Sequence, residues 1–364
     1  MQAVFKMFEN TYEIYFQSVP SFLILILITI AAIILPFYLQ IIIHEAGHLV
    51  FGKLTGYRFL SFRIWNKVLV RENRHWKIKT YSDRDSIGQC LMLPPRKDNR
   101  ETPYALNHLG GIILNGITGI LFLSVSCMEI AFSYFIRLFS FTSGLFGVIM
   151  FIANGLPIRY FGNNDVTNYL ALRKNKSARY FYFQQLKQLP DLQKGKTYGD
   201  LSLEFNRVIK EKDLDNPILG WQKMLEYYSY LDQGWWKKAR ECLSAFQSIK
   251  SLDRGMQYTI QLEELFLSIV FKDDQEEIEM RYQKIKGFIN RKHGDIDLIR
   301  VHLAYKIYRD SQVLTNDKRI KRQEEYRKEM KRRSRNYLYR GKAEFSMKMM
   351  QLVFDQYFCY TVAG

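Results

Sequence analysis

Three residues of the segment His44-Glu45-Ala46-Gly47-His48 have the types and spacing of a zinc-dependent hydrolase. Positions four apart lie on one face of a helix, so the imidazoles of His44 and His48 can bind the same metal ion. Glu45 then lies beside the metal. Its carboxylate can take a proton from a zinc-bound water while that water attacks a peptide carbonyl. The segment therefore predicts metal-assisted hydrolysis with Zn²⁺ as the cofactor.

A catalytic zinc site needs a third protein ligand and one open position. Asp165 is the leading candidate, because it follows Pro157, which should end a helix and leave freed backbone in a polar pocket. Two alternatives remain open. Asp165 has the chemistry of a turn or cap residue, and His108 is a competing third ligand. Asn115, in an otherwise apolar stretch, is expected to hydrogen-bond into the polar cavity.

The elements that must position these residues are membrane spans. From Ser21 to Ile43 the chain runs 23 residues without a charge, which is enough to cross a bilayer core that needs about 20. We predict spans at about 21–51, 107–126 and 139–158, with a kink at Pro36. The largely apolar piece 127–138 is short and contains Arg137, so we assign it to an outer hairpin.

The distribution of charge predicts how the spans are oriented. Residues 53–104 hold twelve Lys and Arg against five acids, which favours the cytoplasmic side. An N-terminal segment, residues 1–20, is then extracytoplasmic, and the basic residues after Arg159 are cytoplasmic if the spans number three. The first and third spans then run in the same direction, which brings Asp165 to the histidines. With four spans the two motifs would lie on opposite faces.

Two soluble parts accompany the membrane core. Residues 54–104 contain β-prone runs at 57–64 and 76–81, separated by the polar turn residues 71–74, and predict a small cytoplasmic β insert. Its edge is expected either to pair with an extended substrate or to be a structural hairpin whose basic residues touch lipid head groups.

Residues 171–364 have a charged, helical pattern. The spacing from Tyr227 through Gly234 to Leu243 is similar to one tetratricopeptide unit, with a weaker echo at 266–278. Such arrays usually bind a peptide or protein, so a cytoplasmic protein partner is expected. Residues 318–342, with twelve Lys or Arg against three Glu, predict a basic helix that contacts anionic lipid or a partner, or is a solvated face.

The bulk composition narrows the class of protein. The formal net charge of +17 is sorted between long apolar runs, which a nucleic-acid binder would not require, so nucleic acid is an unlikely partner. The four cysteines are scattered without metal or staple spacing and are expected to be reduced. The first apolar stretch is too long for a cleaved signal and should remain as an anchor.

The motifs together resemble the site-2 protease family of intramembrane zinc metalloproteases over residues 21–170. The resemblance rests on His-Glu-x-x-His in a first span, Gly111-x-x-x-Asn115 in a second, and Asn154-x-x-Pro157 leading to an Asp after a third. It implies that His44, His48 and Asp165 hold zinc, that Glu45 is the catalytic base, and that Asn154 and Asn115 lie near the site. The family usually places Asp-Gly a few residues after the Pro. Here eight positions separate Pro157 from Asp165, and Val166 follows.

We therefore expect a mainly α, polytopic protein of a bacterial cytoplasmic membrane, with a three-span metalloprotease core, a β insert and a C-terminal tetratricopeptide-like domain. Its expected activity is hydrolysis of a peptide bond in or next to a membrane-inserted segment of a protein or peptide precursor. The alternative is a catalytically inactive relative that binds a membrane peptide as a scaffold. A transporter should have more spans and internal repeats.

Overall fold

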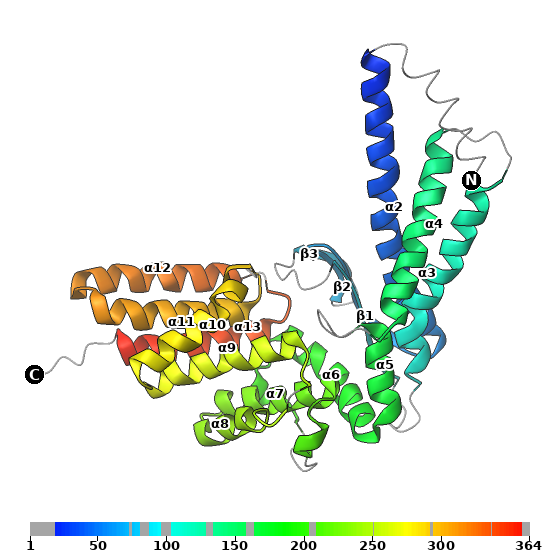
Figure 1. Ribbon diagram of the computed structural model, residues 1–364. Coiled ribbons are helices and arrows are strands. Elements are labelled where there is room, and N and C mark those ends of the chain that lie inside the picture. The colour runs from blue at the N-terminus through cyan, green and yellow to red at the C-terminus, as the bar shows by residue number, and fades with distance from the viewer. Residues whose placement is uncertain are drawn as a thin grey trace, which may run out of the picture.

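The computed structural model describes residues 19–72, 75–80, 87–95, 103–128, 134–157, 164–203, 209–249, 251–291, 294–335 and 337–358. Within them the chain forms twelve α-helices and one four-stranded sheet (Figure 1). The predicted N-terminal segment, apart from the backbone of its last two residues, lies outside the described residues. A helical bundle stands at one end of the molecule, the sheet lies beside it, and the remaining helices extend away from its lower end (Figure 1).

Three helices, α2 (Val19–Leu54), α3 (Ala105–Ser126) and α4 (Tyr134–Gly155), are long and apolar enough to cross a membrane. Their outer faces expose large apolar side chains, as expected for helices surrounded by lipid, which indicates a membrane association. The third span begins five residues earlier than predicted and includes Arg137. That residue lies in the first turn of α4, where a long basic side chain can reach the membrane surface.

Glycines allow the backbones of the three helices to approach closely. A Cβ atom added to Gly47 of α2 would lie 2.3 Å from the carbonyl oxygen of Gly110 on α3. On the other side of α3, a Cβ atom on Gly147 of α4 would lie 2.7 Å from the Cα atom of Gly119. Small residues promote helix association in membranes by permitting such contacts. Gly47 lies between the two histidines of the His-Glu-x-x-His segment, so this contact between α2 and α3 also holds the segment in place.

Pro36 interrupts the hydrogen bonding of α2 without ending the helix. Because proline has no N–H, the carbonyl of Ala32 loses its usual helical partner. The hydroxyl of Thr142 on α4 donates a hydrogen bond to that carbonyl. The freed backbone group is thus satisfied by a neighbouring helix, as membrane burial requires.

The insert between α2 and α3 is an antiparallel sheet with strand order β3-β2-β1-β4. Its strands are β1 (Arg58–Ile64), β2 (Lys67–Glu72), β3 (His75–Thr80) and β4 (Gly88–Leu93). The sequence-based prediction contained only the first and third of these. It was wrong to place Arg71 and Glu72 in a turn, because both pair with β3 at the end of β2. The other two predicted turn residues, 73–74, lie outside the described residues.

The part of the chain after α4 is helical. Its helices are α5 (Asp165–Lys174), α6 (Lys176–Lys194), α7 (Pro217–Asp232), α8 (Trp236–Ser244), α9 (Arg254–Phe271), α10 (Gln275–Arg291), α11 (Ile296–Val313), α12 (Asn316–Ser334) and α13 (Arg340–Tyr357), with short 3-10 turns at Tyr198–Asp200 and Glu211–Asp213. Helices α7 and α8 form one hairpin and α9 and α10 another. Gly234 lies at the first turn with a φ of 76°, a conformation that favours glycine. The assignment of these hairpins to the tetratricopeptide type stays a prediction.

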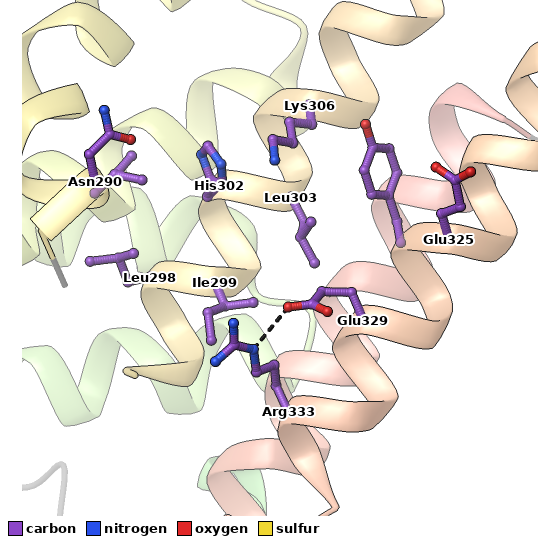
Figure 2. Close-up of a pocket in the computed structure, with 11 residues that line it drawn as sticks. Asn290, Leu298, Ile299, His302, Leu303, Lys306, Glu325, Glu329 and Arg333 are labelled. Atoms are coloured by element: carbon purple, nitrogen blue, oxygen red, sulfur yellow. Dashed lines mark hydrogen bonds and ion pairs between the residues drawn. The ribbon is translucent and has the colours of Figure 1, made fainter. Parts of the chain in front are cut away.

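The basic stretch 318–342, predicted as one helix, is divided between α12 and α13. Its three glutamates each pair with a neighbouring Lys or Arg, so the charge is partly neutralised within α12. A pocket of about 470 Å³ lies between α11 and α12. Figure 2 shows Glu329 and Arg333 of α12, paired at 2.9 Å, directed toward Ile299 of α11. Part of the basic stretch therefore packs inward instead of forming a free charged face.

A buried ion pair lies in the core of the helical domain. Arg300 is 0% exposed and donates from Nη2 to Glu263 Oε1 at 2.6 Å. The hydroxyls of Tyr227 and Tyr228 donate to the same carboxylate at 2.9 and 3.2 Å. The guanidinium also lies 4.3 Å from the ring centre of Phe266. Removing one partner of such a pair leaves the other as an uncompensated buried charge.

We predict that Arg300→Met destabilises the helical domain by about 3–5 kcal/mol, because the Glu263 carboxylate loses its cation. The measurement is thermal unfolding of the purified full chain in detergent, followed by helical circular dichroism. Lys328→Ala is the control, since that exposed side chain pairs with Glu324 on the surface, where a salt bridge contributes about 1 kcal/mol or less. Equal unfolding temperatures for the two variants would show that the Arg300–Glu263 pair does not stabilise the domain as proposed.

Candidate metal site

The two histidines of the motif and Asp165 converge at one point. Nε2 of His44 lies 2.9 Å from Asp165 Oδ2, and Nε2 of His48 lies 3.4 Å from the same oxygen. The two Nε2 atoms are 3.2 Å apart. The side chains are 11%, 12% and 19% exposed, so the cluster is largely shielded from water. Among the described residues, these three form the group of potential metal ligands.

Hydrogen bonds on the far side of each ring determine which nitrogen carries the proton. Nδ1 of His48 lies 2.7 Å from the backbone carbonyl of Asn107, which can only accept, so Nδ1 must donate. Nδ1 of His44 lies 2.6 Å from Oδ1 of Asn115. His44 donates from Nδ1 in the same way, because the side chain of Asn115 turns its oxygen and not its nitrogen toward the ring.

A chain of amides fixes that assignment. Gln40 Nε2 donates to the carbonyl of Ser143 on α4 at 3.0 Å, which leaves the Gln40 side-chain oxygen as an acceptor. Asn115 Nδ2 donates to that oxygen at 2.8 Å and to the Gln40 backbone carbonyl at 3.0 Å. Asn115 must therefore turn its own oxygen toward His44. Gln40 and Asn115 are both fully buried, so no water competes for these bonds.

The consequence is electrostatic. With both protons on Nδ1, the Nε2 atoms of His44 and His48 carry lone pairs, and both face a carboxylate oxygen of Asp165. No donor among the described residues makes a hydrogen bond to this buried oxygen. Three electron-rich atoms at such separations repel one another unless a metal cation lies between them or one ring takes up a second proton. The cluster therefore has the donor set of a metal site.

Zn²⁺ fits these residues. Two imidazole nitrogens and one carboxylate oxygen are typical zinc ligands, and three protein ligands leave a fourth position open. Ligands about 2.0–2.1 Å from a tetrahedral zinc lie about 3.3 Å from one another. The separations of 3.2 and 3.4 Å agree with that value, and the separation of 2.9 Å between His44 Nε2 and Asp165 Oδ2 is shorter. The amide and carbonyl partners on Nδ1 are the usual orienting groups of metal-bound histidines.

Asp165 is positioned by the residue before it. Asn164 caps α5 by accepting from the backbone N–H of Thr167 at 3.1 Å, and its Nδ2 donates to the carbonyl of Ala153 on α4 at 2.8 Å. Asp165 is thus the first residue of α5 and not its cap.

Glu45 lies on the other side of the motif, against the sheet. The residue is 7% exposed. A Cβ atom added to Gly88 of β4 would lie 2.5 Å from Oε1 of Glu45, so only glycine leaves room for this carboxylate. Strand β4 therefore sets the position of the carboxylate that we expect to act as a base.

His108 does not join the cluster. It is 8% exposed, and its ring lies beside that of Tyr182 from α6, tilted by 45° with centroids 5.1 Å apart. The group of potential ligands contains Asp165 in its place. Asn154 donates to the carbonyl of Met150 in its own helix at 3.2 Å. Its expected role in the polar cavity stays a prediction.

Two contributors were missed by sequence reasoning. Gln40 is the only amide in the uncharged run 21–43 and lies one helical turn before His44. This spacing places it on the same helical face as His44 and could have identified it. Asn164 stands directly before the helix that begins with Asp165, in the position where asparagine is a preferred cap. Both act by orienting a ligand instead of touching the metal position.

Comparison of this chain with protein-family models, curated proteins and solved structures found no match. The resemblance to site-2 proteases therefore rests on the motifs and stays a prediction.

We predict that Gly111→Ala weakens Zn²⁺ binding by about tenfold or more, an effect in the range found when a ligand's orientation is disturbed. The added Cβ would lie 2.6 Å from Cε1 of His44 and 2.7 Å from Nε2 of His48, so one ring must move. Gly155→Ala is the control, because its Cβ would meet Ile112 at an ordinary 3.8 Å. Zinc titration of both purified variants checks the prediction, and equal affinities would contradict it.

Proposed function

We propose that this protein is an intramembrane zinc metalloprotease that hydrolyses a peptide bond within or next to a membrane-inserted segment of its substrate. The observation that carries the proposal is that two oriented imidazoles, on a helix long and apolar enough to span a membrane, converge with the largely shielded carboxylate of Asp165 from α5. The motif resemblance to site-2 proteases supports the same activity.

The residues divide the proposed reaction between them. His44, His48 and Asp165 would hold the zinc ion, which when bound supplies Lewis acidity that favours deprotonation of water and polarises a carbonyl. Glu45 accepts the proton of the attacking water and returns it to the leaving amine. Its nearly complete burial against β4 limits the carboxylate to a narrow set of positions, which favours proton transfer.

The position of the site along α2 supports cleavage at the membrane boundary. His44 lies 22 residues after Phe22, the start of the candidate span. At 1.5 Å per residue this is about 33 Å, close to the thickness of a bilayer core of about 30 Å. A substrate bond reaching the histidines would therefore lie near the far face of the hydrocarbon region.

The sidedness of the protein is part of the proposal. The basic insert and the basic helical domain favour the cytoplasmic face, at which α2 and α4 would both end. The contact between His44 and Asp165 supports this arrangement, because it requires the ends of the first and third spans to lie on the same side. The bacterial cytoplasmic membrane remains the expected location.

We predict that Glu45→Gln keeps zinc and loses at least about 10²-fold in cleavage, a typical contribution of a general base. The purified chain is reconstituted in lipid vesicles and tested on a panel of single-span peptides. Unchanged cleavage by Glu45→Gln would refute the proposed mechanism. If the wild type binds zinc and cleaves none of the panel, the inactive scaffold becomes the better explanation.

Asp165→Ala is expected to lose bound zinc, because two histidines alone leave the ion without its third protein ligand. His108→Ala is the matched control and should retain about one zinc per chain, since the wild-type ring lies beside Tyr182 instead of joining the cluster. Metal analysis after dialysis measures both. If Asp165→Ala keeps its full zinc content and His108→Ala loses zinc, then His108 and not Asp165 is the third ligand.

A further inference from the structure

Helix α12 has an inner face that holds it to the rest of the helical domain. The hydroxyl of Tyr326 donates a hydrogen bond to Asp310 of α11 at 2.7 Å. Four residues later, on the same side of the helix, Met330 is 3% exposed. Arg319, seven residues before Tyr326, donates to the carbonyl of Leu314 at 2.9 Å. These contacts fix which side of α12 is turned to solvent.

The solvent side of α12 is cationic. The helix holds nine Lys or Arg against four Asp or Glu. Four exposed cations, here called the α12 cationic face, are Lys318, Lys321, Lys331 and Arg335. Lys321, Lys331 and Arg335 are separated by nearly whole numbers of helical turns and share one side. The ion pairs of α12 are made by other side chains, so none of these four has an anionic partner among the described residues.

Figure 1 shows the direction in which this face is turned. Helix α12 runs crosswise to α2 and forms the outermost layer of the helical domain, with α11 and α13 packed beneath it. Its exposed side is therefore turned toward the side of the molecule on which the three apolar helices rise. The sheet lies between α12 and the bundle at about the same height as α12 (Figure 1).

The sheet relates this height to the membrane. A Cβ atom added to Gly88 would contact Glu45, and one added to Gly52 would contact Met92, so the sheet packs on α2 directly after His44. The length of α2 places His44 near the face of the hydrocarbon region. Helix α6 contacts β4, and α13 contacts both α6 and α12, so continuous packing connects the sheet to α12. The cationic face thus lies near the level of the lipid head groups and is turned toward them.

The spread of the charge favours a bilayer over a small anion as the occupant. From Lys318 to Arg335 the cations extend along about 25 Å of helix. The pocket beside α12 contains Glu325 and Glu329 and lies against α11, on the inner face. A flat array of lipid phosphates can meet all four cations at once, because the helix lies along the surface and not across it.

We infer that the α12 cationic face binds anionic head groups of the membrane that α2, α3 and α4 cross, and so holds the far end of the helical domain against the bilayer. Each Lys or Arg near an anionic bilayer surface strengthens binding by about fivefold. The domain is already tethered through α5, so docking is intramolecular and a few cations suffice. The inference requires that the three helices span a membrane, and it requires neither zinc nor hydrolysis.

The test measures lysine acetylation of the full-length chain by mass spectrometry, in nanodiscs wide enough to extend beneath α12. The discs contain phosphatidylcholine alone or mixed equally with phosphatidylglycerol. In the anionic discs, acetylation of Lys318, Lys321 and Lys331 is expected to slow by about fivefold or more. Salt at about 1 M should remove the difference, because it screens charges beyond about 3 Å. The internal control is the exposed Lys237 of α8, a helix at the opposite side of the domain (Figure 1), which should react equally in both discs.

A pair of charge reversals tests the face itself. Lys321→Glu/Lys331→Glu changes its charge by four units and is expected to weaken docking on the order of several hundredfold. Lys318 should then react in anionic discs at the rate seen in neutral discs. Lys237→Glu/Lys238→Glu makes the same change on exposed residues of α8 and should leave the protection of Lys318 intact. Helical circular dichroism should be equal for both variants.

The inference is overturned if the α12 lysines react at the same rate in neutral and anionic discs, or if the reversal on α12 leaves their protection intact. Glycerol phosphate added to neutral discs provides the comparison with a soluble anion. Equal protection by that anion would also overturn the inference, since the face would then bind phosphate groups without a bilayer.

Discussion

A buried imidazole offers a lone pair to a metal only when its other nitrogen has a fixed acceptor for its proton. In this protein, side chains and backbone groups from all three helices of the bundle together fix that acceptor for His44. The carbonyl of Ser143 on α4 orients Gln40 on α2, Gln40 orients Asn115 on α3, and Asn115 orients His44. Each membrane helix supplies one step. The direction of the imidazole therefore depends on the relative positions of all three helices, and rotation of any one would break the sequence of donors and acceptors.

The geometry of the site consequently depends on how closely the three helices pack. Gly47 and Gly110 bring α2 and α3 into backbone contact, while Gly111 leaves the space that the two imidazoles occupy. Thr142 joins α4 to α2 at the carbonyl freed by Pro36, before the helix reaches Gln40. Larger residues at the glycines would act on packing and on the imidazoles together. A membrane bundle without a strong hydrophobic driving force between its helices depends on such contacts.

The helix of the motif, the number of spans and the nearness of Asp165 were predictable, because they follow from apolar run length, a four-residue spacing and the distribution of charge. Other features depend on tertiary partners. A lone amide such as Gln40 looks like a packing residue until its neighbours are known. Arg137 obscured the start of α4, because a charge is tolerated at a span's end. Strand β4 was missed, since Gly88 is a poor strand former whose presence is explained only by the Glu45 carboxylate beside it.

Asp165 belongs to a different helix from the two histidines, and that helix is the first one after the three apolar helices. Asn175 both ends α5 and caps α6, so the chain passes from one helix to the next without an intervening loop. A cation bound by these three side chains would join α5, at the start of the helical domain, to α2 of the three-helix bundle. Binding of metal would then stabilise the attachment of the helical domain to the three apolar helices, whether or not any substrate is turned over.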